Sequence, residues 1–298
     1  MKAKKSKSRQ KPNMQLAADI NGLSLTAHKF AAAAPKKNIT LFCLPGGGLS
    51  KDYFNLAPNF SFAARMSALG YDVITMDHPG VGDNALPAEH PFYTPREAAG
   101  YLSKALAQWD IKTPIIGIGH SLGGMMIMLM QGLYSPFTRL GLFGSSAGGL
   151  DWGLSEEEKA YINKPDEFAR EIEAMSLAKF GCATIPAGKG PSGESITFGG
   201  QTPELNERLR AAASEMNAAG AMMSMMRGSF RPEAEAIEVP LFFAFGDHDI
   251  GIPPQDVPKD FPSASSTKTI ILNSTGHNHF AFSSIGKLCK AFDAWVCQ

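Results

Sequence analysis

The stretch Pro114-Ile-Ile-Gly-Ile-Gly-His-Ser-Leu-Gly-Gly124 predicts a strand that turns tightly into a helix. Its first half is a short apolar run, and the segment 122–133 that follows is rich in methionine and leucine. A serine at such a turn needs small neighbours, because larger side chains would collide with the strained backbone. Gly119 and Gly123 flank Ser121, so the pattern Gly-x-Ser-x-Gly predicts a hydroxyl exposed above the carboxyl end of a strand.

Further apolar runs alternate with helix-length segments along most of the chain. Runs that are apolar on both faces are typical of parallel strands covered by helices. The pair Asn21-Gly22, between two strand-like runs within 17–30, predicts an antiparallel hairpin at the sheet edge. We therefore expect an α/β fold with a mostly parallel sheet of about eight strands. The predicted strands are 39–44, 72–76, 114–118, 139–143, 239–245 and 267–272, and the predicted helices are 53–69, 94–109, 122–133 and 279–296.

The segment 149–232 interrupts this alternation. It is charged and helical in places, and it is rich in glycine and proline at 186–200. The next segment able to form a strand begins only near Ile237. This favours an insertion between two strands of the sheet over an independent domain. We expect residues 15–148 and 233–298 to form one core and 149–232 to form a helical cap. Its predicted helices are 155–163, 166–180 and 203–226.

The amino terminus is basic, whereas the whole chain has 28 basic and 28 acidic residues. That overall balance argues against nucleic acid as a partner. No apolar segment follows the basic residues before Pro12, so they do not form a secretory signal, and no apolar run is long enough to span a membrane. The four cysteines lack a Cys-x-x-Cys pattern and predict reduced thiols. We expect a disordered tail at 1–14 and a cytoplasmic monomer or homodimer.

The order of these elements resembles the α/β-hydrolase superfamily over about residues 17–298. The segment Gly119-His120-Ser121-Leu122-Gly123 carries the most specific part of the resemblance. The resemblance implies a serine hydrolase with an inserted cap, of the esterase, lactonase or thioesterase kind. It also implies that the nucleophile, the acid and the base follow one another along the chain in that order.

A serine hydroxyl is a weak nucleophile at neutral pH and needs a base that an acid orients. The resemblance places the base after the last strand, where His277 directly follows a glycine and His279 is the alternative. It places the acid three residues beyond Gly246, at Asp249. Asp247 is the nearer rival, and we interpret it as bonded to loop amides. Some relatives place the acid after the preceding strand, where Asp151 would serve.

The oxyanion hole of such enzymes uses the amide after the nucleophile and one amide after an earlier strand. These positions correspond to Leu122 and Gly47, with Gly48 as the alternative for the second. The run 218–226 holds four methionines and predicts an adaptable apolar wall, although core packing explains the same run. The predicted substrate-binding residues are Gly48, Met222 and Met226.

The sequence therefore predicts hydrolysis of a carboxylic ester, lactone or thioester of a small hydrophobic acyl substrate through an acyl-serine. C–C bond hydrolases and acyltransferases use the same triad and remain alternatives, as does a non-catalytic binding protein of this fold. We expect no cofactor and no metal. A second Gly-x-Ser-x-Gly match at 144–148 precedes a poor helix start and predicts only a small-residue loop.

Overall fold

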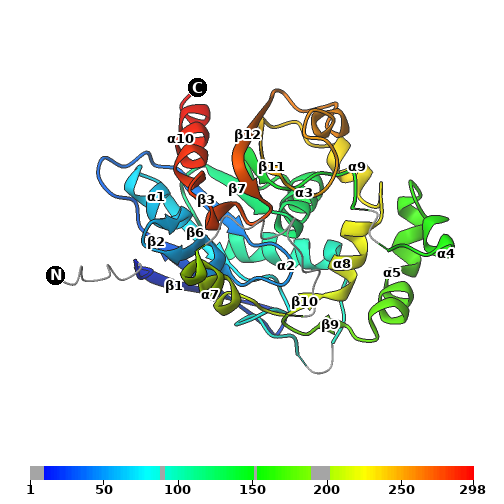
Figure 1. Cartoon of the computed structure of the whole chain (residues 1–298). Coiled ribbons are helices and arrows are strands. Elements are labelled where there is room, and N and C mark those ends of the chain that lie inside the picture. The colour runs from blue at the N-terminus through cyan, green and yellow to red at the C-terminus, as the bar shows by residue number, and fades with distance from the viewer. Residues whose placement is uncertain (1–9, 88–90, 151–152, 189–201) are drawn as a thin grey trace.

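The computed structural model describes residues 10–87, 91–150, 153–188 and 202–298. A central sheet with helices on both faces dominates these residues (Figure 1). Its eight strands lie in the order β1-β2-β6-β3-β7-β8-β11-β12. In this sheet the neighbouring strands β6, β3, β7, β8, β11 and β12 pair in parallel. Strand β1 pairs with β2, and β2 with β6, in antiparallel orientation. The strand bounds are β1 Met14–Ile20, β2 Leu23–Phe30, β3 Thr40–Leu44, β6 Asp72–Met76, β7 Ile115–His120, β8 Arg139–Phe143, β11 Leu241–His248 and β12 Thr267–Gly276. The predicted fold class is confirmed.

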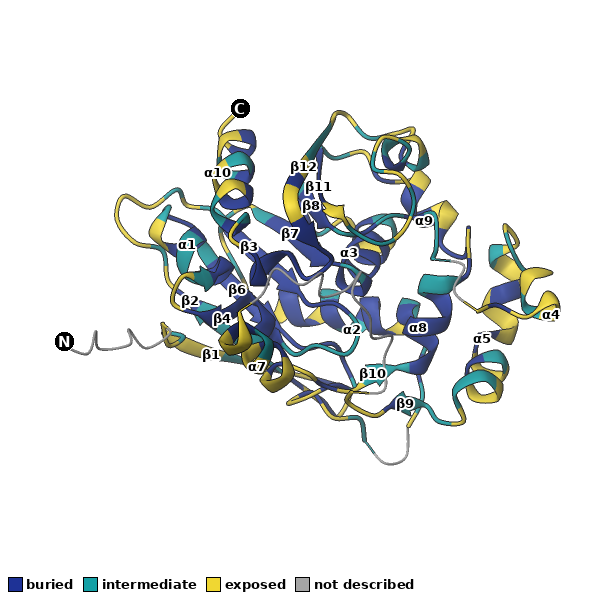
Figure 2. Ribbon diagram, in the orientation of Figure 1, coloured by how far each residue is buried: buried dark blue, intermediate teal, exposed yellow. Residues whose placement is uncertain are grey.

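Two apolar clusters fill the space between the sheet and its helices. One contains residues of α2 (Pro95–Gln108) and α3 (Leu122–Tyr134), and the other contains residues of α1 (Phe62–Ala68) and α10 (Ile285–Val296). Every residue of α3 from Leu122 to Gln131 is buried, which explains its uniformly apolar composition. The central strands are mostly buried, while exposed residues gather on the outer helices and on the edge strands β1 and β12 (Figure 2).

The edge hairpin and the second helix follow their sequence signals. Asn21 and Gly22 both have positive φ, at 58° and 85°, as the predicted tight turn between β1 and β2 requires. Thr94 accepts a hydrogen bond from the amide of Glu97, and the Glu97 carboxylate accepts one in return from the amide of Thr94. This reciprocal capping sets the start of α2.

The helix predicted over 53–69 is wrong in its first half. Residues there form a short 3₁₀ turn, η1 (Lys51–Phe54), and a small hairpin of β4 (Asn55–Ala57) and β5 (Phe60–Ser61). Pro58 lacks the amide hydrogen that a helix interior needs, so it favours the hairpin turn. Helix α1 begins after Ser61, whose hydroxyl accepts the amide of Ala64. The last predicted helix likewise starts later, after the 3₁₀ turn η3 (His279–Ala281).

Between β8 and β11 the described chain forms short helices and a two-stranded ribbon. Helix α5 (Pro165–Phe180) packs against α8 (Ala218–Met225), which in turn contacts α3. The helix predicted over 203–226 is two helices, because residues 212–217 pair with other segments of the chain instead. The elements are α4 Glu156–Lys159, α5 Pro165–Phe180, β9 Thr184–Ile185, α7 Pro203–Ala211, β10 Met216–Asn217, α8 Ala218–Met225 and α9 Arg231–Glu235. A short 3₁₀ turn, η2 (Val257–Asp260), follows β11.

The predicted tail at 1–14 differs from the structure over its last residues. Residues 1–9 lie outside the described residues. The backbone oxygen of Gln10 accepts a hydrogen bond from Asn55, and Asn13 bonds to the backbone of Lys29 and Ala31. Met14 already pairs within β1. The amino-terminal boundary of the folded body therefore lies before residue 14. Over the described parts of the chain, we find no helix with the length and apolar character needed to cross a membrane.

Candidate active site

Ser121 occupies the sharp turn between β7 and α3. Its φ of 52° and ψ of −121° are a strained conformation for a residue with a side chain. A Cβ on Gly119 would lie 2.3 Å from Cα of Gly124, and one on Gly123 would lie 2.2 Å from the carbonyl oxygen of Leu44. Both contacts involve backbone that cannot give way, so the requirement for glycine on each side of Ser121 is confirmed.

Asp249 lies after β11 and accepts hydrogen bonds from two histidines. Its Oδ1 is 2.6 Å from Nδ1 of His277, and its Oδ2 is 2.7 Å from Nε2 of His279. The amides of Gly246 and Ile250 donate to the same carboxylate. Burial alone would raise the pKa of Asp249, but the two histidines hold that pKa well below its ordinary value. The carboxylate is therefore ionised at neutral pH.

His120 supports the loop that carries His277. Its Nε2 lies 2.7 Å from the carbonyl oxygen of His277, so it donates a hydrogen to that oxygen. Burial, together with the neighbouring His277 and His279, lowers the pKa of His120 well below its ordinary value. The ring is therefore neutral, and its buried position suits packing and support of the His277 loop.

Ser121 and His277 line one cavity of about 590 Å³. Gly47, Gly48 and Leu122 line it as well, so the structure brings five of the predicted site residues to one place. Asp249 lies behind His277 rather than on the cavity wall. The apolar part of the wall comes mainly from Leu150, Phe180, Ile185, Leu209, Met216, Met225 and Ile250. The wall is thus largely apolar, and its polar side chains are those of His120, Ser121, Asn206, Arg210, Ser214, Ser224, His277 and Asn278.

The predicted methionine wall requires a correction. Met222 and Met226 are fully buried in the core and do not line this cavity. Met225, on the same helix α8, lines it, and so does Met216 from β10. Successive helix residues point in different directions, so only the packing of α8 on α3 and α5 selects which methionine reaches the cavity.

The glycine loop after β3 lies against the serine. A Cβ on Gly46 would be 3.3 Å from Cβ of Ser121 and 2.8 Å from Nδ1 of His120. A Cβ on Gly47 would be 2.4 Å from Sδ of Met216, which covers this residue. Gly46 and Met216 are not among the site residues predicted from the sequence. The glycine run itself signals a close approach, but only the fold shows what approaches.

The same loop is hydrogen-bonded to the segment that follows α7. The amide of Ser50 donates to the carbonyl oxygen of Ala212 at 2.8 Å, and the amide of Ser214 donates to that of Gly48 at 2.9 Å. Leu49 and Ala213 form a bridge between these bonds. The chain inserted between β8 and β11 therefore holds the loop beside Ser121 in place.

Asp247 and the second serine motif differ in their local geometry from Asp249 and Ser121. Asp247 accepts hydrogen bonds from the amides of Ser274 and Thr275, as its interpretation as a loop-bonding residue requires. Asp151 lies outside the described residues. Ser146, at the centre of the second Gly-x-Ser-x-Gly match, has no positive φ and no helix follows it directly. Only Ser121 therefore has the geometry of a strand-to-helix turn.

Comparison with known proteins agrees with this geometry. The sequence model of the alpha/beta hydrolase family matches residues 41–284. The chain belongs to the alpha/beta hydrolase family. No curated protein matches the sequence significantly.

Several solved structures resemble the chain over almost its whole length. A soluble variant of monoglyceride lipase from Saccharomyces cerevisiae is 18% identical, with a TM-score of 0.66 and coverage of 99% of this chain and 97% of that one. An esterase from Exiguobacterium antarcticum is 15% identical, with a TM-score of 0.64 and coverage of 96% and 100%. A bromoperoxidase from Bacillus anthracis is 17% identical, with a TM-score of 0.62 and coverage of 96% and 100%. At these identities the likeness is one of fold.

Proposed function

We propose that this alpha/beta hydrolase cleaves a carboxylic ester, lactone or thioester of a hydrophobic substrate through an acyl-Ser121 intermediate. One observation carries the proposal: the Asp249–His277 pair and the strained Ser121 meet at one cavity. In the proposed triad, Ser121 is the nucleophile, His277 the base and Asp249 the acid that orients the base.

The hydrogen bond to Asp249 supports the role of His277. A carboxylate only accepts, so Nδ1 carries the hydrogen and the lone pair lies on Nε2 of the neutral ring. In the proposed reaction, Nε2 takes the hydroxyl proton as Ser121 Oγ attacks the acyl carbon. The imidazolium then returns this proton to the leaving group, and water releases the acyl group by the same route. Among the described residues no hydrogen bond joins Ser121 to His277, and in hydrolases without substrate this bond is often long.

The amides of Leu122 and Gly47 are the proposed donors to the oxyanion. Leu122 is the first residue of α3, so its amide points out of the helix start, where the helix dipole favours negative charge. Gly47 lies in the loop that closely approaches Ser121 through Gly46. The bonds from this loop to Ala212 and Ser214 would hold its amide in place during the reaction.

The apolar wall supports a hydrophobic acyl group as the substrate. Phe180, Ile185 and Met225 line the cavity, and all three come from the chain between β8 and β11. We propose that residues 149–232 act as a cap that excludes water and selects the acyl chain, while the triad is held by the sheet. Movement of such a cap would have to break the bonds between residues 48–50 and 212–214.

A fluorophosphonate probe tests the proposal directly, because it bonds covalently to an activated serine. We expect labelling of the wild-type protein and its loss in Ser121→Ala. Ser146→Ala is the matched control, since Ser146 shares the local motif without the strained turn. The Ser146→Ala protein should label and hydrolyse p-nitrophenyl butyrate like the wild type. Equal labelling of Ser121→Ala and the wild type would contradict the proposal.

A further inference from the structure

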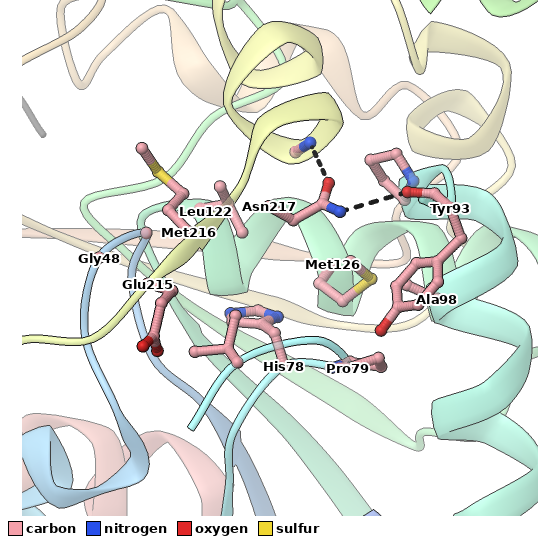
Figure 3. A pocket seen from close by; sticks show the side chains of 14 residues that line it. Gly48, His78, Pro79, Tyr93, Ala98, Leu122, Met126, Glu215, Met216 and Asn217 are labelled. Carbon is pink, nitrogen blue, oxygen red and sulfur yellow. Dashed lines mark hydrogen bonds between the residues drawn. The ribbon is translucent and has the colours of Figure 1, made fainter. Parts of the chain in front are cut away.

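A second, smaller cavity of about 20 Å³ adjoins the large one. Gly47, Gly48, Leu122 and Met216 line both cavities and therefore form the partition between them. Figure 3 shows Met216 and Leu122 at one side of the small cavity, with His78 and Tyr93 on its wall. A space of this volume holds about one oxygen atom with its hydrogens.

Two buried polar atoms on residues that line this cavity have no hydrogen-bond partner among the described residues. They are Nδ1 of His78 and the hydroxyl of Tyr93, on side chains that are only 5% and 6% exposed. The hydroxyl is at the end of the Tyr93 ring that lies nearest His78 (Figure 3). Buried polar groups in folded proteins are nearly always satisfied, so two unsatisfied atoms at one cavity indicate a missing polar partner.

The hydrogen bonding of His78 determines what that partner can be. Its Nε2 lies 2.7 Å from the carbonyl oxygen of Pro45, which only accepts, so Nε2 carries the ring hydrogen. Burial lowers the pKa of His78, which keeps the ring neutral and leaves a lone pair on Nδ1. The His78 side of the cavity therefore accepts a hydrogen bond.

Tyr93 offers the complementary group. Burial raises the pKa of Tyr93, so its phenol keeps its hydrogen and can donate it. An O–H group can donate to Nδ1 and accept from the phenol through a single heavy atom, whereas an amide needs two heavy atoms to do both, more than a cavity of this size admits. An ether or carbonyl oxygen cannot donate, and an ammonium group cannot accept.

The other residues that line the small cavity further restrict which chemical groups it could bind. Val81, Ala98 and Met126 are apolar, and both polar groups of the Asn217 amide are engaged by Tyr93 and Gly220. Among the described lining residues Glu215 is the charged one, and its negative charge disfavours a carboxylate. The cavity is suited to an uncharged hydroxyl.

We propose that His78 and Tyr93 form a hydroxyl-binding subsite, which receives a hydroxyl of the substrate when the Met216 side chain moves aside. The subsite deepens the proposed function and rests on it. Methionine has three rotatable side-chain bonds, so it can open the partition without movement of the backbone. The substrate class is then a hydroxylated ester, lactone or thioester, whose hydroxyl lies beyond the loop of Gly47.

Matched substrates test the subsite without any change to the protein. One series consists of p-nitrophenyl esters of straight-chain acids with and without a terminal hydroxyl. The other consists of butyrate esters of alkanols and of the corresponding diols. We expect a hydroxyl preference of about tenfold in kcat/KM at one chain length of one series, the size of one hydrogen bond. Absence of a preference at every length in both series would mean that the cavity holds only water, and would overturn the proposal.

Variants of two tyrosines test whether the hydroxyl preference arises at this cavity. In Tyr93→Phe the ratio of the two kcat/KM values should fall towards one, because only the hydroxyl is removed. Tyr101→Phe is the matched control, since the Tyr101 ring packs against Tyr93 at 5.9 Å but does not line the cavity. It should keep the wild-type ratio. A preference that survives in Tyr93→Phe would place the hydroxyl elsewhere and overturn the subsite.

The fluorophosphonate probe separates the two proposals. Labelling of Ser121 without a hydroxyl preference would leave the proposed function intact and remove the subsite. Failure of labelling, together with no hydrolysis of either series, would remove both.

Discussion

Nε2 of His279 lies 2.7 Å from Oδ2 of Asp249, the same carboxylate that His277 contacts through Oδ1. The two histidines differ in their access to substrate. His277 lines the large cavity, whereas His279 is fully buried and does not. His279 is therefore placed to hold the carboxylate, and under the proposed function His277 is the histidine that meets the substrate.

Replacement of each histidine by alanine tests this division. We expect His277→Ala to lower kcat for p-nitrophenyl butyrate by about a thousandfold or more, since the base is lost. His279→Ala should lower it by about tenfold, because Asp249 loses one of four hydrogen bonds but keeps the bond to His277. His248→Ala, at a half-exposed position near the same strand end, is the control. An inactive His279→Ala beside an active His277→Ala would reverse the assignment.

The low pKa of Asp249 predicts an acid-dependent part of stability. The folded pKa lies below the unfolded value of about 3.9, so ionisation of Asp249 stabilises the fold above about pH 4. This contribution is lost as the pH falls through the folded pKa. The free energy of unfolding of the wild type should therefore fall more steeply from pH 6 to pH 3 than that of Asp249→Asn. Urea titrations across this range measure both slopes.

A carboxylate without buried partners provides the comparison for this titration. Asp110 is exposed, and within the described part of the chain its ion pair is with the exposed Lys112. Asp110→Asn should therefore follow the wild-type slope. If Asp249→Asn also follows it, the two histidines do not stabilise the ionised carboxylate.

The methionines of α8 should separate into two kinds. Met222→Ala removes a fully buried side chain and should lower the free energy of unfolding by about 2–5 kcal/mol, without changing chain-length preference. Met225→Ala enlarges the cavity and should shift the preferred p-nitrophenyl ester towards longer acyl chains. Urea denaturation and kcat/KM across the ester series distinguish these effects. If Met222→Ala alone altered the chain-length preference, Met222 rather than Met225 would line the cavity.

Two amino-terminal truncations should differ in stability. A chain that starts at Gln10 keeps every described contact of this region and should retain the wild-type Tm. A chain that starts at Gln15 loses the Asn13 bonds and the first residue of β1, and its Tm should fall by about 2–5 °C. Equal Tm values for both chains would mean that residues 10–14 add nothing to the fold.

Local patterns were sufficient to predict the fold and the sharp turn. Apolar runs on both strand faces predict a buried parallel sheet, and Asn21-Gly22 predicts a hairpin because few residues tolerate positive φ. Gly119 and Gly123 predict the turn at Ser121 for a steric reason that operates within a few residues. The helix expected over 53–69 was wrong in its first half, because a hairpin around Pro58 forms there instead.

Only the tertiary structure decided which side chains meet. His277 and His279 are two residues apart, and their spacing does not determine which one reaches the cavity and which one is buried behind Asp249. Met222 and Met225 are equally apolar, and the packing of α8 alone turns one into the core and the other to the cavity. His78 and Tyr93 face one small cavity although no local pattern links them. Contacts between distant segments depend on how whole elements pack, and the apolar periodicity of one element does not specify its partner.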